Sequence, residues 1–131
     1  MYFASDNAAP AAPEVMAALT KANEGYAQSY GSDEIMDRVT AQIRDVFEAP
    51  EAAVYLVSTG TTANALALSV LAAPWQTIFC HRHSHIEEDE CNAPEFFTGG
   101  AKLTLVGEGD KMTGQMLRET LTALQVRGVH R

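Results

Sequence analysis

The segment formed by residues 53–80 constrains the fold of this chain more than any other. It begins with AVYLVS (53–58), a short apolar run typical of a strand buried on both faces. The turn STGTT follows, and then the alanine- and leucine-rich stretch 62–71, which predicts a helix ended by Pro74. A second apolar run, 77–80, predicts another strand. Strand, helix and strand in this order indicate a βαβ unit with parallel strands.

The rest of the chain carries patterns that extend this unit. Apolar residues between Ile35 and Phe47 recur at helical spacing and predict an amphipathic helix, for which Ser32 or Asp33 is the capping residue. We therefore expect an α/β fold with a parallel-sheet βαβ core, in one partial domain that spans residues 1–131. The other expected elements are helices at 13–24, 92–97 and 113–124 and a strand at 102–106.

The charge of the chain argues against two classes of partner. It has 17 acidic and 9 basic residues, a formal net charge of −8. Nucleic acids and anionic membranes bind basic faces, so we expect neither as a partner. The first ten residues lack the regions of a secretion signal, and no apolar run approaches the roughly 20 residues that span a bilayer. We expect a cytoplasmic protein in which Cys80 and Cys91 are free thiols.

The turn STGTT (58–62) is the first candidate binding site. It lies where a strand enters a helix, and there the N–H groups of the first helical turn are unpaired and the helix dipole is positive. Gly60 lets a ligand approach the backbone, and Thr59, Thr61 and Thr62 add hydroxyl groups. A phosphate fits these features, although a threonine in such a place is more often only the helix cap. The turn matches neither the P-loop nor the dinucleotide-binding pattern.

The segment CHRHSHIEEDEC (80–91) is the second candidate site. Alternate residues of an extended segment share a face, so His81, His83 and His85 could converge with Cys91 on a metal. C-x-x-C spacing is absent, and although His81 and His85 stand four residues apart, we expect no metal site. The segment follows the second predicted strand as STGTT follows the first, and ligands of open α/β sheets bind at that edge. An imidazole here could stack on a flat cofactor whose phosphate the turn holds.

Four motifs resemble those of a known enzyme family and occur in the same order. They are SDNAAP (5–10), YGSD (30–33), STGTTAN (58–64) and HSHIEEDECNAPEFFTGGAKL (83–103). Over almost the whole chain they resemble the N-terminal part of the low-specificity threonine aldolases, which are pyridoxal-phosphate enzymes of fold type I. The resemblance implies the large, cofactor-binding domain of a fold type I transferase-like enzyme, present here in truncated form.

The resemblance also implies roles for individual residues. Gly60 and Thr61 correspond to residues that hold the cofactor phosphate, and His85 to the histidine that stacks on the pyridine ring and relays a proton. Ser5 matches a serine near the substrate carboxylate. The family cleaves a β-hydroxy-α-amino acid, such as threonine or allo-threonine, to glycine and a carbonyl product (acetaldehyde from threonine), with the cofactor as electron sink. The remaining neighbours of the implied site are Tyr30, Thr59 and Glu90.

One departure from the family concerns the lysine that forms the Schiff base. In the family this residue lies further along the chain than this sequence extends, and Lys21, Lys102 and Lys111 do not correspond to it. Without that amine the expected nucleophile is missing, so we expect these 131 residues alone to be inactive. Surfaces that a further part of the enzyme would cover favour self-association, and we expect a homo-oligomer.

Three alternatives remain open on the sequence. Another fold type I lyase or an aminotransferase shares the architecture, and activity on allo-threonine against other amino acids would separate it. A metal-binding module could use His81, His83, His85 and Cys91, and elemental analysis would detect it. A non-catalytic α/β subunit that only assembles, with itself or with a longer partner, is the third.

Overall fold

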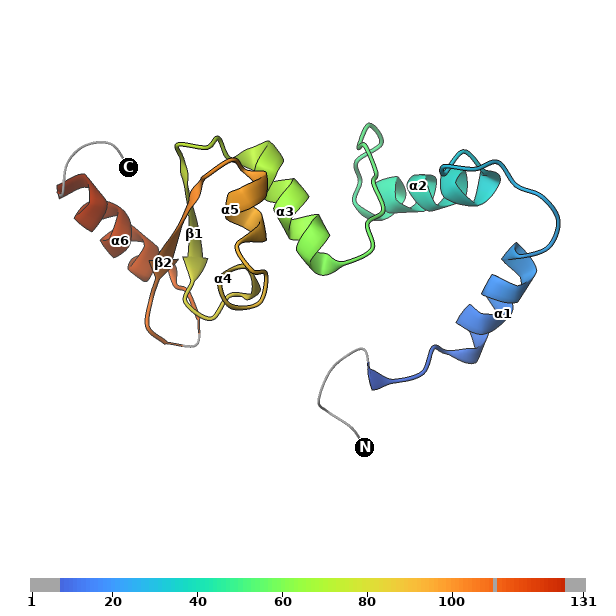
Figure 1. Cartoon of the computed structure of the whole chain (residues 1–131), viewed down its shortest axis with the longest axis horizontal. Coiled ribbons are helices and arrows are strands. Elements are labelled where there is room, and N and C mark those ends of the chain that lie inside the picture. The colour runs from blue at the N-terminus through green and yellow to red at the C-terminus, as the bar shows by residue number, and fades with distance from the viewer. Residues whose placement is uncertain (1–7, 110, 127–131) are drawn as a thin grey trace. The chain divides into compact units, whose positions relative to one another are not determined.

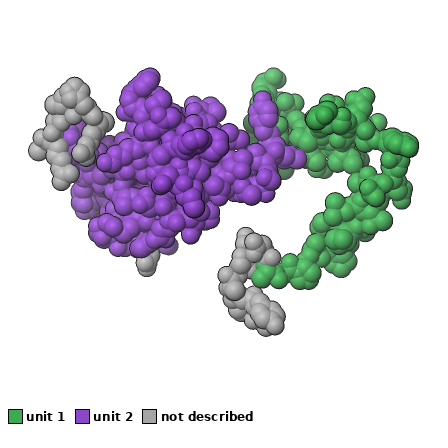
Figure 2. Space-filling view, viewed as in Figure 1, with its two compact units in different colours: residues 1–54 green, residues 55–131 purple. Residues whose placement is uncertain are grey.

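The structure, a computed structural model, describes residues 8–109 and 111–126 (Figure 1). The chain divides into two compact units, residues 1–54 and residues 55–131 (Figure 2). We describe each unit by itself. Ser5, one of the predicted site residues, lies outside the described residues.

The first unit contains two helices, α1 (Pro13–Ala22) and α2 (Glu34–Val46), both close to their predicted positions. Asp33 begins α2, because its Oδ1 accepts hydrogen bonds from the N–H groups of Ile35 and Met36 at 2.9 and 3.0 Å. After α2 the chain turns back, and Arg44 Nε donates a hydrogen bond to the carbonyl of Ala52. Within residues 8–54 no residue is buried, so local hydrogen bonds rather than a core define this unit.

The second unit contains the sheet. Its two strands are parallel, and their register runs from Thr77 opposite Lys102 to His81 opposite Val106. An α/β fold with parallel strands is therefore confirmed, and α3 packs against α5 beside the sheet (Figure 1). The elements are α3 (Gly60–Leu71), β1 (Thr77–His81), α4 (His85–Glu88), α5 (Ala93–Phe97), β2 (Lys102–Val106) and α6 (Gly114–Val126).

The core of this unit is small and lies between α3, α5 and the strands. Thr98 closes the turn from α5 to β2, because its Oγ1 donates to the carbonyl of Pro94 at 2.8 Å and accepts from the N–H of Ala101 at 3.1 Å. Gly99 ends α5 with a φ of +76°, and a Cβ there would stand 3.2 Å from Cγ of Pro74. The buried apolar residues are Ala65, Cys80, Ala101, Leu103 and Val106.

The strand predicted at residues 53–58 is wrong. This segment has no regular secondary structure, and Tyr55 and Leu56 are 83% and 63% exposed instead of buried on both faces. A strand forms only against a hydrogen-bonding neighbour, and in the described parts of the chain β1 pairs only with β2. The parallel βαβ unit is therefore formed by β1, α4, α5 and β2 rather than by residues 53–80.

Candidate functional site

The segment that holds the predicted histidines leaves the carboxyl end of β1. His81 is the last residue of that strand, and α4 begins at His85 after a tight turn in which the N–H of Ser84 donates to the carbonyl of His81. The helix α4 was not predicted, since a single helical turn carries no periodic apolar pattern. It places His85 at the edge of the sheet where open α/β folds bind ligands.

A buried carboxylate holds the imidazole of His85. Nδ1 of His85 lies 2.8 Å from Oε1 of Glu90, and the amide Nδ2 of Asn64 donates to the same oxygen at 2.7 Å. The side chain of Glu90 is fully buried, whereas that of His85 remains 63% exposed. The arrangement therefore holds Nδ1 of the ring from inside the protein and leaves more than half of the side chain accessible.

The second oxygen of Glu90 makes this arrangement unusual. Oε2 is buried and has no hydrogen-bond partner among the described residues. A buried carboxylate is costly unless it is well hydrogen-bonded, because burial removes the charged group from water. Glu90 thus occupies a position where a carboxylate is only half satisfied, which argues for a role in the site beyond packing.

The turn before α3 has features of a helix cap and also of a turn that could bind a phosphate. Thr59 is the helix cap, because its Oγ1 accepts from the N–H of Thr62 at 3.1 Å and lies 2.9 Å from the Thr62 hydroxyl. The carbonyl of Thr59 accepts a hydrogen bond from the N–H of Ala63. Within the described residues, the N–H groups of Gly60 and Thr61 therefore keep no partner. No atom stands within 4 Å of a Cβ added to Gly60, so its backbone is open to a ligand.

Asn64 connects this turn with the histidine. Gly60 and Asn64 are four residues apart in α3, and residues at this spacing lie on the same helix face. Asn64 in turn reaches Glu90, which holds His85. The two predicted parts of the site are therefore joined through one face of α3 by two hydrogen bonds. The sequence argument did not single out Asn64, although it belongs to the motif STGTTAN.

The other histidines turn toward different partners. His83 Nδ1 lies 2.7 Å from Oε1 of Glu88, and the N–H of His83 donates to Nδ1 of His81 at 3.1 Å. Cys91 is exposed. In the searched range, which leaves out residues 1–7, 110 and 127–131, no three His, Cys, Asp or Glu side chains come together as a metal site would require.

Tyr30 was predicted as a neighbour of the site, and Lys102 was predicted not to take part in it. Tyr30 belongs to the first unit, where it is fully exposed in a turn with a φ of +61°, so its role stays a prediction. Lys102 begins β2 opposite Thr77. At about 3.3 Å per residue, four residues put it roughly 13 Å along the strands from the carboxyl edge. That Lys102 is not the Schiff-base lysine stays a prediction.

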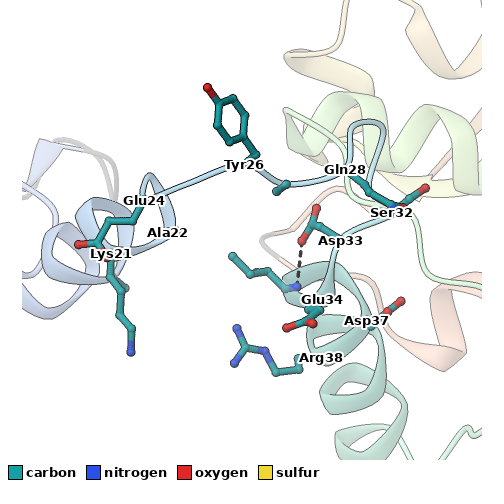
Figure 3. A pocket seen from close by; sticks show the side chains of 13 residues that line it. Lys21, Ala22, Glu24, Tyr26, Gln28, Ser32, Asp33, Glu34, Asp37 and Arg38 are labelled. Atoms are coloured by element: carbon teal, nitrogen blue, oxygen red, sulfur yellow. Dashed lines mark hydrogen bonds between the residues drawn. The ribbon is translucent and has the colours of Figure 1, made fainter.

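A separate hollow lies in the first unit (Figure 3). Its volume is about 700 Å³, and it is lined by α1, the following loop and the start of α2. Figure 3 shows Lys21 on one side and Asp33, Glu34, Asp37 and Arg38 on the other. Apart from Asp33, which is half-buried, these side chains are exposed, and the hollow contains none of the predicted site residues.

Among the described residues, no helix combines the length and the apolar character that crossing a bilayer requires.

Comparisons with a family model and with known proteins agree with each other. The sequence model of the beta-eliminating lyase family matches residues 2–131. A low-specificity L-threonine aldolase of Pseudomonas sp. (strain NCIMB 10558) is 42% identical over 129 residues, which are 98% of this chain and 36% of that enzyme. The enzyme of the same name from Pseudomonas aeruginosa is 39% identical over 129 residues, again 98% of this chain and 36% of that enzyme.

A solved structure shows the same fold. The structure of Leishmania major threonine aldolase superposes with a TM-score of 0.78 over 88% of this chain and 34% of that one, at 24% sequence identity. The chain thus spans about a third of the length of these relatives. The resemblance to the threonine aldolases and the fold type I architecture are confirmed.

Proposed function

The chain belongs to the beta-eliminating lyase family, and on this premise we propose that it is the cofactor-binding part of a pyridoxal-phosphate-dependent threonine aldolase. The observation that carries the proposal is the buried Glu90, whose Oε1 holds His85 and Asn64 at 2.8 and 2.7 Å. It connects an accessible imidazole with the helix face that begins at Gly60. The names of the relatives support the substrate class, a β-hydroxy-α-amino acid.

The residues present fit pyridoxal phosphate. The free N–H groups of Gly60 and Thr61, in the first turn of α3, would hold the phosphate, with the Thr61 hydroxyl as a further donor. Gly60 offers open space where any other residue would place a Cβ. The side chain of His85 is 63% exposed, which leaves room for a pyridine ring to stack on it. When bound, the cofactor supplies the electron sink for cleavage of the Cα–Cβ bond.

The side chains of the chain would orient the reactants and move protons. His85 keeps Nδ1 against Glu90, so Nε2 is the atom that can accept or return the proton of a substrate hydroxyl. Ser5 and Tyr30 are proposed as neighbours of the substrate, and Thr59 and Glu90 as supports of the site. Since none of Lys21, Lys102 and Lys111 is the family's lysine, we propose that these 131 residues do not turn over by themselves.

The proposal includes the setting of the protein. Residues 1–131 would form one partial domain of a cytoplasmic homo-oligomeric enzyme, with no nucleic acid or membrane as partner. The net charge of −8 supports the absence of both polyanionic partners.

A charge placed at the phosphate turn tests cofactor binding. We expect the chain to bind pyridoxal phosphate weakly, with a dissociation constant on the order of 1 mM, about −4 kcal/mol. Gly60→Asp should weaken this binding roughly tenfold or more, because a carboxylate at the first helical residue repels the phosphate. Equilibrium dialysis with pyridoxal phosphate, and with pyridoxal as the ligand that lacks the phosphate, measures the effect.

The chain offers a matched control for this substitution. Thr113 caps α6 as Thr59 caps α3, and Gly114 follows it as Gly60 follows Thr59. Gly114→Asp therefore makes the same change at the start of another helix and should leave binding unchanged. Equal losses in the two variants, or equal binding of pyridoxal and its phosphate, would contradict the assignment of the turn.

A second candidate reaction is β-elimination, which the description of the matched family favours. A chimera in which these residues replace the matching 129 residues of the Pseudomonas sp. aldolase separates the two. We expect glycine and acetaldehyde from threonine, lost in the His85→Ala chimera. Release of pyruvate and ammonia from serine without aldol cleavage would favour β-elimination.

A further inference from the structure

We propose that Glu90 is a positioning residue that fixes the tautomer and the ring orientation of His85, with Asn64 as its anchor on α3. The inference rests on the proposed function for its purpose, because His85 is the residue whose proton would be used. The inference itself concerns which nitrogen of the His85 ring carries the proton, and this can be measured without any cofactor.

The hydrogen bonds decide which nitrogen of His85 carries the proton. Asn64 presents an amide nitrogen, which can only donate, to Oε1 of Glu90 at 2.7 Å. An ionised carboxylate only accepts, so Nδ1 of His85, 2.8 Å from the same oxygen, must be the second donor. In the neutral ring Nε2 is then the unprotonated nitrogen. The pair thus leaves Nε2 as the accepting atom of a side chain that is 63% exposed.

Burial makes this carboxylate a stricter partner than an exposed one. The neighbouring pair His83 and Glu88 has the same spacing of five residues and a similar Nδ1–Oε1 separation of 2.7 Å. There both side chains are about half exposed, whereas Glu90 is fully buried. Water competes for the exposed pair and is kept from the buried one, so only the His85 pair should impose one tautomer.

The backbone after Glu90 supports the same conclusion. Cys91 and Asn92 follow it with φ values of +50° and +61°, two consecutive residues in the left-handed region without a glycine. Asparagine tolerates this region, whereas a residue with a larger side chain such as cysteine is strained in it. The strained turn reverses the chain between α4 and α5, and Glu90, directly before it, reaches Asn64 on α3. The strained turn therefore belongs to the segment that places the buried carboxylate against Asn64.

The test is the tautomer of His85 in the chain without cofactor. Nitrogen-15 NMR of histidine-labelled protein, above the pH at which the ring is neutral, distinguishes the two ring nitrogens, and His85→Asn identifies the signals. We expect the Nδ1–H form to dominate in the unaltered chain. In Glu90→Ala the ratio of the Nδ1–H to the Nε2–H form should fall roughly tenfold, as expected for the loss of a hydrogen bond to a charged group.

Two further variants separate positioning from folding. Glu90→Gln retains an oxygen that can accept hydrogen bonds. Because the Asn64 amide group donates, it keeps the oxygen of the new glutamine, rather than its nitrogen, at the Oε1 position. The Nδ1–H form of His85 should therefore persist. Asn64→Ala keeps the carboxylate but removes its anchor, and the Nδ1–H form should decrease by a smaller factor than in Glu90→Ala. Glu88→Ala, the matched control at the exposed pair, should leave the His85 signals unchanged. Circular dichroism shows which variants remain folded.

These experiments distinguish a failure of the positioning role from a failure of the proposed function. An Nε2–H form in the unaltered chain, or a Glu90→Gln variant that changes the tautomer as much as Glu90→Ala, would overturn the inference. A preserved tautomer together with no binding of pyridoxal phosphate would leave the positioning role intact and count against the cofactor assignment alone.

Discussion

At the scale of single residues, the two cysteines show how burial sets reactivity. Cys80 is the fourth residue of β1 and is buried, whereas Cys91 is exposed. Burial raises the pKa of the Cys80 thiol above its ordinary value of 9.0, and the carboxylates of Glu87 and Glu95 raise it further. The thiolate is the reactive form, so Cys80 should be the inert thiol that its place in a strand predicts.

Alkylation kinetics test this difference. At pH 8 iodoacetamide should modify Cys91 rapidly and Cys80 only when denaturant unfolds the chain. Because the pKa of Cys80 is raised in the folded state, its neutral thiol favours folding below pH 9, and this contribution is lost as the pH rises through the folded pKa. Cys91→Ser provides the control with a single thiol. If Cys80 were modified as fast as Cys91 in native buffer, Cys80 would not be protected by burial in β1.

At the scale of elements, α2 illustrates a helix defined by its cap rather than by packing. None of its residues is buried, although Ile35, Val39 and Ile43 form the apolar stripe that the sequence shows. Isolated helices of 13 residues are marginal in water. The two hydrogen bonds that Asp33 accepts at the first turn therefore contribute a large share of its stability.

Hydrogen exchange of the α2 amides measures that contribution. Asp33→Ala should lower the free energy of local opening by about 1 kcal/mol, which speeds exchange roughly fivefold. Asp37 lies in the same first turn but accepts no capping bond, so Asp37→Ala removes only its interaction with the helix dipole. The exchange rates should change less in this variant. Equal effects would mean that charge, and not the cap, begins the helix.

At the scale of the whole molecule, exposed apolar side chains are the dominant feature. At the end of α3, Val70 is 86% exposed and Trp75 in the following turn is 81% exposed. In the first unit Val46 and Phe47 are also largely exposed. Within each unit, large apolar side chains exposed to this extent favour docking of another protein segment. The relatives, about three times as long, contain further chain that could cover such surfaces.

Self-association is the expected behaviour of the 131-residue chain. Sedimentation should show a mass that rises with concentration, and Val70→Lys should reduce the association because it places a charge on the apolar surface. Gln42→Lys, which adds the same charge at an exposed polar position of α2, should have little effect. A chain that stays monomeric at every concentration would show that these surfaces are not docking surfaces.

Among the described elements, the amino-acid sequence by itself determined the two strands and the helices other than α4. Asp33 and Thr59 cap α2 and α3, and Gly99 ends α5, because these effects depend on groups within one or two turns of the chain. The motifs also single out His85, Gly60, Thr61 and Glu90 as candidate site residues, and their roles stay proposals.

Only the tertiary structure decided two matters. The apolar run 53–58 has the composition of a strand but is irregular, because a strand needs hydrogen bonds from a neighbour that its own sequence does not supply. The connection from Asn64 through Glu90 to His85 joins residues 26 and 5 positions apart, and no local pattern encodes it. Its physical origin is the packing of α3 against α5, which buries the carboxylate and thereby selects its partners.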